Sequence, residues 1–177
     1  MNAAVVYESV YGNTRAIAEA IAEGLGGAPV VPVSQADAEM AHAELLVVGG
    51  PTHMHGIASI RSRQMAVEAA HEDAGTHVEP GAGAEPGLRA WLRDLSTVVG
   101  VRAATFDTRL DKSPWFTGLA SRGIERRLHH HGYEVIATES FLVKESEGPL
   151  EEGEIDRARA WGKELAQRLA AHAGTAS

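Results

Sequence analysis

The sequence of 177 residues is 44% hydrophobic and 23% charged, which is the size and balance of one compact domain with a full core. Cysteine is absent, which excludes disulfides, thiolate metal sites and a cysteine nucleophile, and fits a cytoplasmic location. The formal net charge of -8 disfavours nucleic acid and anionic lipid as partners. Without a signal-type segment or an apolar run of about 18 residues, we predict neither export nor a membrane span.

Strand-like and helix-like segments alternate along the chain. Residues 3–7 are a β-branched run, and residues 14–25 place apolar side chains at helical spacing. Further strands are expected at 29–33, 44–50, 101–108 and 133–138, and further helices at 36–42, 57–71, 88–95, 115–131 and 153–171. Continuous apolar strands between helices predict a doubly wound α/β domain whose parallel sheet is covered on both faces.

We assign this domain to residues 1–172 and expect a flexible tail at residues 173–177. Residues 57–87 are its least regular part and are treated as an insertion. The segment 73–87 is rich in Gly, Pro and Ala, and loops of that length inside a domain are typically functional or disordered. Because it follows the third strand, it is expected near the ligand end of the sheet.

The loop after the first strand carries the sequence SVYGNT at residues 9–14. It offers the small hydroxyls of Ser9 and Thr14, an amide and backbone N–H groups at a helix N-terminus, which is typical of an anion site. A nucleotide P-loop would end in Gly-Lys-Ser/Thr, and the dinucleotide fingerprint would have three spaced glycines; both are missing. The loop therefore suits a single terminal phosphate, while the alternative is that these residues only cap the first helix.

A second glycine-rich turn, GGPTHMHG, ends the third strand, so two loops would flank one crevice. These motifs resemble the phosphate loop and the flavin-lining loop of the flavodoxin family, and the resemblance extends from residue 5 to about residue 169. It implies a flavodoxin-like domain with a five-stranded parallel sheet in the order 2-1-3-4-5. It also implies FMN as the cofactor.

The same resemblance implies which residues hold the cofactor. The FMN phosphate would bind at Ser9, Val10, Tyr11, Gly12, Asn13 and Thr14. One side of the isoalloxazine would face Pro51, Thr52, His53, Met54, His55 and Gly56, and the other side Asp107, Thr108, Arg109 and Trp115. Gly56 is a candidate for a backbone flip that turns a carbonyl toward the reduced flavin.

Two departures from the family pattern have consequences. Tyr11 replaces the usual threonine, and its ring could lie either on the cofactor or on the protein. The second loop carries His53 and His55 and no aromatic ring of the Trp or Tyr type. Imidazoles favour the negative charge of a reduced flavin, so we expect a less negative reduction potential than in electron carriers that sandwich the flavin between such rings.

Other polar clusters have simpler explanations. The three histidines at residues 129–131 cannot all face one metal ion from a helix, and are expected at a helix C-terminus that Gly132 ends. His53 and His55 lack a third ligand, so no metal site is assigned. The acidic residues between 145 and 156 either solvate the start of the last helix or dock a basic redox partner.

The sequence predicts an FMN-binding electron-transfer protein that works between a reductase and an acceptor enzyme. No general acid or base is needed, so no catalytic residue is assigned. One alternative is a flavoenzyme of the NAD(P)H:quinone reductase or protoporphyrinogen oxidase type, in which residues 57–87 help build a substrate pocket. Another is a non-redox domain that binds a different phosphate ligand; the oligomeric state stays open.

Overall fold

The computed structural model describes residues 2–36, 40, 43–53, 56–72, 78–111 and 119–174. Its long sheet consists of the strands β1 (Ala3–Tyr7), β2 (Val30–Pro32), β3 (Leu45–His53), β5 (Arg102–Leu110) and β6 (Glu134–Val143). These strands run parallel in the order β2-β1-β3-β5-β6. Counted without the short strand β4, this is the predicted order 2-1-3-4-5, and the predicted fold class is confirmed. An additional two-residue strand, β4 (Gly56–Ile57), pairs antiparallel with the end of β3.

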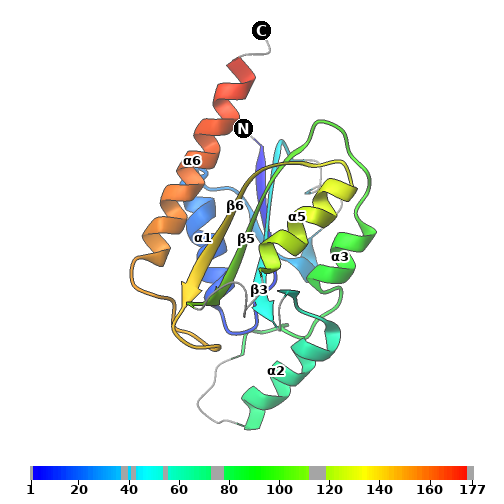
Figure 1. Cartoon of the computed structure of the whole chain (residues 1–177), viewed down its shortest axis with the longest axis vertical. Helices are drawn as coiled ribbons and strands as arrows, with labels where there is room; N and C mark the ends of the chain where they lie inside the picture. Colours follow the sequence, from blue (N-terminus) through cyan, green and yellow to red (C-terminus); the bar gives the residue numbers. More distant parts are fainter. Residues whose placement is uncertain are drawn as a thin grey trace.

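Helices cover both faces of this sheet (Figure 1). The helices α1 (Asn13–Gly24) and α6 (Glu154–Gly174) pack on one face, and α3 (Leu88–Asp94) and α5 (Ala120–His130) pack on the other. A short 3-10 helix, η1 (Val33–Gln35), follows β2. The helix α2 (Ile60–Glu72) projects past the strand arrowheads in Figure 1. It therefore stands at the edge where open α/β sheets bind ligands.

The central strands β1 and β3 supply two cores from single apolar runs. Val5 and Val47 are buried beneath α1 and α6, while Val6 and Val48 are buried beneath α3 and α5. Successive side chains of a strand point to opposite faces, so a continuous apolar run serves both. This is the pattern expected of parallel strands in the middle of a covered sheet.

Glycines allow α1 and α6 to approach closely. A Cβ at Gly24 would lie 2.2 Å from the carbonyl oxygen of Arg159, and a Cβ at Gly162 would lie 2.2 Å from that of Ile21. Side chains at these positions would force the two helices apart. The contact fixes α1, whose first turn carries the predicted anion site, against the last helix.

Most predicted segments are present, and among the strands β6 differs most in length. It continues to Val143, whereas the sequence predicted an end at residue 138. The extension is stabilised by Phe141, which is fully buried and meets the Trp161 ring edge-on with centroids 6.1 Å apart. Polar residues at 139 and 140 interrupt the apolar run, so the pattern of hydrophobic residues predicts an earlier end of the strand.

The predicted insertion has a helical and a non-helical part. Residues 60–72 form α2, close to the predicted helix, and residues 78–87 contain no helix. The helix predicted at residues 36–42 and the first part of that predicted at 115–131 lie largely outside the described residues. The assignment of residues 173–177 to a tail stays a prediction, since α6 is described to Gly174.

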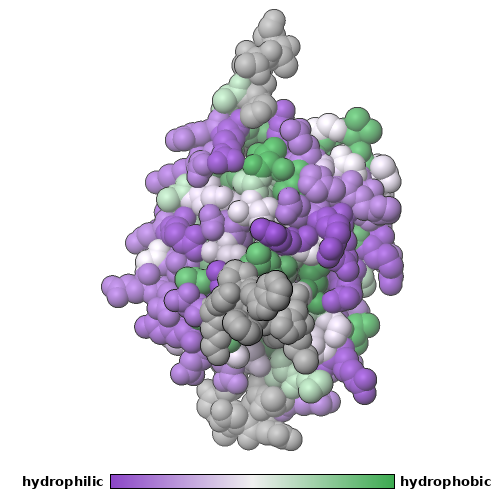
Figure 2. Space-filling model, viewed as in Figure 1, coloured by the Kyte–Doolittle hydropathy of each residue, from purple (hydrophilic) through white to green (hydrophobic). Residues whose placement is uncertain are grey.

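Hydrophilic residues dominate the face seen in Figure 2, where hydrophobic residues form small separate areas. In the described part of the chain the exposed large hydrophobic side chains are Ile60, Met65 and Val99, of which the first two lie on α2. Within the same residues, no helix combines the length and the apolar character needed to cross a membrane.

Candidate functional site

The carboxyl ends of β1, β3 and β5 meet at one edge of the sheet. The parallel register pairs Tyr7 with Gly49 and Gly49 with Phe106, and further along pairs Pro51 with Thr108. The loop at residues 9–14, the end of β3 at residues 51–53 and the end of β5 therefore lie side by side. These are the three segments that the sequence predicted to surround a flavin.

The loop at residues 9–14 turns into α1 through a left-handed glycine. Gly12 has a φ of 90°, in the left-handed region that glycine adopts without strain. Its N–H donates to Ser9 Oγ at 3.1 Å, and its carbonyl accepts from the Ala16 N–H at 3.0 Å to begin α1. The first-turn N–H groups of a helix have no partners within the helix and carry a partial positive charge. They are available to an anion at this end of α1.

Two side chains of the loop hold it in place. The hydroxyls of Thr14 and Thr108 lie 2.7 Å apart in a buried hydrogen bond that joins the loop to β5. Asn13 Nδ2 donates to the Glu147 carbonyl at 3.0 Å and so joins the loop to the segment after β6. The sequence counted these polar groups among the phosphate ligands. In the structure these two side chains contact the protein, and their contact with a phosphate stays a prediction, as does that of the backbone N–H groups.

Tyr11 is directed toward α2. Its hydroxyl donates to the Ala66 carbonyl at 3.4 Å, a long hydrogen bond. Burial raises the pKa of the Tyr11 hydroxyl, and the nearby Glu147 carboxylate adds to this effect. The sequence left two positions open for the Tyr11 ring, one on the cofactor and one on the protein. The hydrogen bond to Ala66 favours the position on the protein.

The ends of β3 and β5 hold the N-terminus of α5. Thr52 Oγ1 accepts from the Ala120 N–H at 3.0 Å. Asp107 is fully buried, and its Oδ2 accepts from the N–H and the hydroxyl of Ser121 at 2.8 and 2.7 Å. Carboxylates are favourable at helix N-termini. Thr52 and Asp107 thus hold the N-terminus of α5 at the ends of β3 and β5. The sequence predicted that both residues line the flavin, and this contact stays a prediction.

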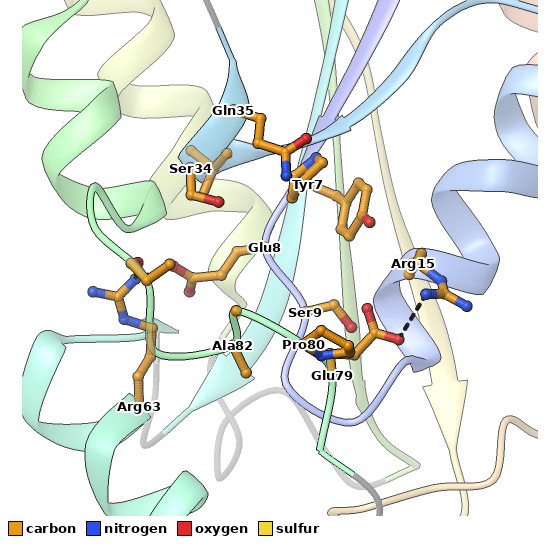
Figure 3. A pocket seen from close by; sticks show the side chains of 14 residues that line it. Tyr7, Glu8, Ser9, Arg15, Ser34, Gln35, Arg63, Glu79, Pro80 and Ala82 are labelled. Carbon is orange, nitrogen blue, oxygen red and sulfur yellow. Dashed lines mark hydrogen bonds and ion pairs between the residues drawn. The ribbon is translucent and has the colours of Figure 1, made fainter.

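A carboxylate lies against the predicted phosphate loop. The Glu79 N–H donates to the Val10 carbonyl at 2.8 Å, and Glu79 Oε1 would lie 3.2 Å from a Cβ built on Gly12. The same oxygen forms an ion pair with Arg15 Nη1 at 3.1 Å (Figure 3). No sequence pattern indicates this contact, because Glu79 belongs to a segment without periodicity. The loop is therefore approached by a negative charge that Arg15 neutralises.

A cavity of about 270 Å³ opens beside this loop. Figure 3 shows Ser34 and Gln35, which follow β2, on one side and Glu79, Pro80 and Ala82 on the other, with Ser9 near the latter. Its walls thus come from the ends of β1 and β2 and from the non-helical part of the predicted insertion. The insertion is therefore part of the candidate site.

The floor of this cavity contains a buried ion pair. Arg63 Nη1 lies 2.9 Å from Glu8 Oε2, and both side chains are 4% exposed. Arg63 also pairs with Glu85 at 2.5 Å, and Glu8 Oε2 accepts from the Leu88 N–H at 2.8 Å. Burial raises the pKa of Glu8, while the Leu88 N–H and Arg63 act in the opposite direction. These contacts attach α2 and the start of α3 to the end of β1.

The comparisons with known proteins agree with this geometry. Residues 4–64, which contain both motifs, match the flavodoxin domain family. Together with the solved structures described next, this match shows a flavodoxin-like fold. A search of curated proteins finds no match.

Solved structures extend the flavodoxin-like fold over the whole chain. A flavodoxin from Streptococcus pneumonia is 20% identical with a TM-score of 0.61, covering 94% of this chain and 98% of its own. Flavodoxin 2 from Bacillus cereus is 15% identical with a TM-score of 0.63, covering 95% and 99%. A WrbA-like flavodoxin from Agrobacterium tumefaciens is 18% identical with a TM-score of 0.57, covering 97% and 98%. At such identities the likeness concerns the fold.

Several residues that the sequence predicted for the flavin site are not among the described residues or are described only in part. Met54, His55 and Trp115 are outside the described residues, and His53 is seen as the last backbone position of β3. Gly56 begins β4, where no atom lies within 4 Å of a Cβ built on it. Arg109 is half-buried, and its Nη1 donates to the Leu110 carbonyl at 3.1 Å.

One prediction outside the site is confirmed. The helix α5 ends at His130 and is followed by Gly132 with a φ of 86°, so the three histidines stand at a helix C-terminus. Imidazolium at that position complements the helix dipole.

Proposed function

We propose that this chain binds FMN through the loop at residues 9–14 and transfers electrons between protein partners. The observation that carries the proposal is the arrangement of this loop. Its glycine is left-handed, its polar side chains hold it to β5 and to the segment after β6, and its free N–H groups begin α1. No lysine is in the loop, which suits one phosphate group better than a triphosphate.

The proposal extends to the walls of the flavin site. Pro51 and Thr52, near the end of β3, lie beside Asp107, Thr108 and Arg109 of β5, so the isoalloxazine would lie over this edge. The family resemblance adds further residues to the proposed FMN site, namely Val10, Tyr11, His53, Met54, His55, Gly56 and Trp115. When bound, FMN supplies the redox chemistry, and the chain's residues set its orientation and its access to partners.

The charge of the surface near the loop supports a basic redox partner. Glu145 and Glu147 are exposed in the segment after β6, and the Glu147 carbonyl holds Asn13 of the loop. The net charge of -8 would steer the protein toward basic surfaces at low ionic strength. A docked reductase or acceptor enzyme would thus meet carboxylates close to the proposed cofactor. A cytoplasmic location is part of this proposal.

One observation favours a second candidate, an FMN-dependent enzyme of the quinone reductase type. The predicted insertion lines the cavity beside the loop, as a substrate-binding segment would. Steady turnover of NAD(P)H with a quinone and no added reductase would select this candidate. Reduction only in the presence of a partner reductase would select the electron carrier.

Binding of FMN is tested with a glycine pair. Gly12→Ala places a side chain at a φ of 90° and 3.2 Å from Glu79, within the loop. Gly26→Ala introduces the same kind of strain at a φ of 87° but has no neighbour within 4 Å, and it lies past the C-terminus of α1. We expect Gly12→Ala to weaken FMN binding about tenfold or more, since charge-assisted hydrogen bonds to the loop are disturbed.

The measurement is quenching of flavin fluorescence by the purified chain, with FMN and with riboflavin, which lacks the phosphate. Wild-type protein should bind FMN more tightly than riboflavin, and Gly26→Ala should match wild type. Equal binding of the two flavins, or equal losses in the two glycine variants, would refute a phosphate site in this loop. Urea unfolding of both variants separates binding from stability.

A further inference from the structure

A second cavity lies between α3, α5 and the beginning of α2. Its volume is about 280 Å³, and four of its eight lining residues are arginines, namely Arg63, Arg89, Arg93 and Arg127. None of the residues at 9–14 lines it. This concentration of positive charge is unexpected in a chain with 16 Lys and Arg against 24 Asp and Glu.

Two of the four arginines are neutralised by carboxylates. Arg63 pairs with Glu8 and Glu85, as described above, and Arg93 Nε lies 2.7 Å from Asp94 Oδ1. Their charges are therefore compensated within the chain. They contribute to the walls of the cavity without requiring a ligand.

The other two arginines are held by backbone carbonyls. Arg89 Nη2 donates to the Ile57 carbonyl at 2.6 Å, and Arg127 Nη1 donates to the Gly123 carbonyl at 2.9 Å. In the described part of the chain, no carboxylate lies within ion-pair distance of either guanidinium. Each guanidinium is thus oriented while its charge is left without a counter-charge.

The electrostatics of Arg127 agree with this picture. Burial lowers the pKa of Arg127, and the positive charges of Arg89 and Arg126 lower it further. Like charges close together are unfavourable, and a bound anion would relieve the repulsion. Planar guanidinium groups bind carboxylate and phosphate oxygens in matching pairs.

The rest of the cavity wall is apolar. Ala58, Ile60 and Ala90 line it beside the arginines, and Ile60 is 54% exposed although it is a large hydrophobic residue. An apolar surface next to fixed donors is typical of small-molecule sites. It would accommodate the body of a ligand whose charged end meets the arginines.

We propose that this cavity binds the oxyanion of a small organic molecule, with Arg89 and Arg127 holding a carboxylate or phosphate and Ile60 contacting an apolar body. The site goes beyond the proposed FMN function, because it shares no residue with the phosphate loop. Yet it is close to the proposed flavin wall: the Ile57 carbonyl that orients Arg89 belongs to β4, which pairs with Thr52 at the end of β3.

The experiment is a calorimetric titration of the full chain with benzoate, phenyl phosphate and the neutral analogue benzamide. We expect at least one of the two anions to bind about tenfold more tightly than benzamide, because charge-assisted bonds are lost with the amide. Tighter binding of phenyl phosphate assigns a phosphate ligand, and tighter binding of benzoate assigns a carboxylate. Binding of neither anion by about 10 mM would overturn the proposal.

A matched pair of variants tests the position. Arg127→Gln removes a cavity charge, whereas Arg126→Gln removes the same charge from the neighbouring exposed position, about 100° away around α5. Arg127→Gln should weaken anion binding about tenfold and Arg126→Gln by less than about twofold. Equal losses would mean that net charge alone attracts the anion, which would also overturn the proposal. Thermal unfolding checks that both variants fold.

The result is separable from the FMN proposal. Phenyl phosphate bound at the phosphate loop would be sensitive to Gly12→Ala and insensitive to Arg127→Gln; that pattern would count against the cavity. Binding that depends on Arg127 supports the cavity even if FMN does not bind at all.

Discussion

Arg63 and Arg127 line the same cavity, but their surroundings differ. The Arg63 side chain is 4% exposed and has two carboxylates, Glu8 and Glu85, within hydrogen-bonding distance. Arg127 is half-buried and donates to the Gly123 carbonyl, while its charged neighbours in the described residues are the arginines at 89 and 126.

The difference separates a structural charge from one that is open to a ligand. A buried charge with its counter-charges in place stabilises the contact between the elements that carry them, and removing one partner leaves the other unpaired. The Arg63 contacts attach α2 and the segment before α3 to the end of β1. A fixed charge without a counter-charge contributes little to the fold, and this is why we propose an anion from outside the chain as the partner of Arg89 and Arg127.

The largest effect is expected for Arg63→Met. It leaves the Glu8 carboxylate buried without a cation and should lower the free energy of unfolding by about 3–5 kcal/mol at pH 8. Burial already raises the pKa of Glu8, and loss of Arg63 raises it further. A raised carboxylate pKa means that stability is lost as pH rises above the unfolded value of about 4.5. The difference from wild type, measured by urea unfolding, should therefore be smaller at pH 5 than at pH 8.

The control is the double variant Glu8→Gln with Arg63→Met. It removes the unpaired carboxylate, so much of the lost stability should return and the pH dependence of the difference should largely disappear. A single variant that is equally destabilised at both pH values would show that lost packing around Arg63, and not its charge, is responsible.

A smaller effect is expected for a substitution of Glu79. Its ion pair with Arg15 is intermediate between the buried pairs of Arg63 and the charge of Arg127, which has no carboxylate partner among the described residues. Arg15 is 46% exposed and the Glu79 side chain 10%, so this pair is closer to solvent than Glu8 and Arg63. Glu79→Gln removes the negative charge beside Gly12 and one of the two carboxylates that pair with Arg15. We expect FMN to bind about three- to tenfold more tightly, since charge interactions near the surface contribute about 1 kcal/mol.

Glu19→Gln is the matched control for this variant. Glu19 is the other carboxylate of Arg15, at 3.3 Å, but it lies one turn further along α1 and is 55% exposed. It should leave FMN binding unchanged in the same fluorescence titration. Weaker binding in Glu79→Gln would mean that Glu79 supports the loop through its contact with Arg15 more than it repels the phosphate.

The fold could be predicted because its signals are local and periodic. The apolar run of β1 and the helical spacing of α1 are each contained in a dozen residues or fewer, and the residues 9–14 between them are contiguous. The family resemblance depends on the same contiguous motifs. Where a signal is interrupted, as by Glu139 and Ser140 in β6, the predicted strand stops early although Phe141 is buried beyond it.

The charged contacts could not be predicted because their partners are distant in sequence. Glu8 and Arg63 are 55 positions apart, and Arg89 meets a carbonyl 32 positions away. Arg127 lines a cavity because α3 packs beside α5, which brings together residues that are distant in sequence. No periodic pattern distinguishes an arginine that will be neutralised from one that will not, since tertiary packing decides it.

The smallest effect is expected for the stability of Arg127→Gln, and it tests the comparison most directly. The variant loses a hydrogen bond to the Gly123 carbonyl but also removes a charge that burial and two neighbouring arginines disfavour. These contributions oppose each other, so the free energy of unfolding should change by no more than about 1 kcal/mol in either direction. Urea unfolding beside Arg63→Met, in a buffer without phosphate or carboxylate, measures the contrast. A loss as large as that of Arg63→Met would mean that Arg127 is a structural charge too, and would remove the reason to expect an anion in the cavity.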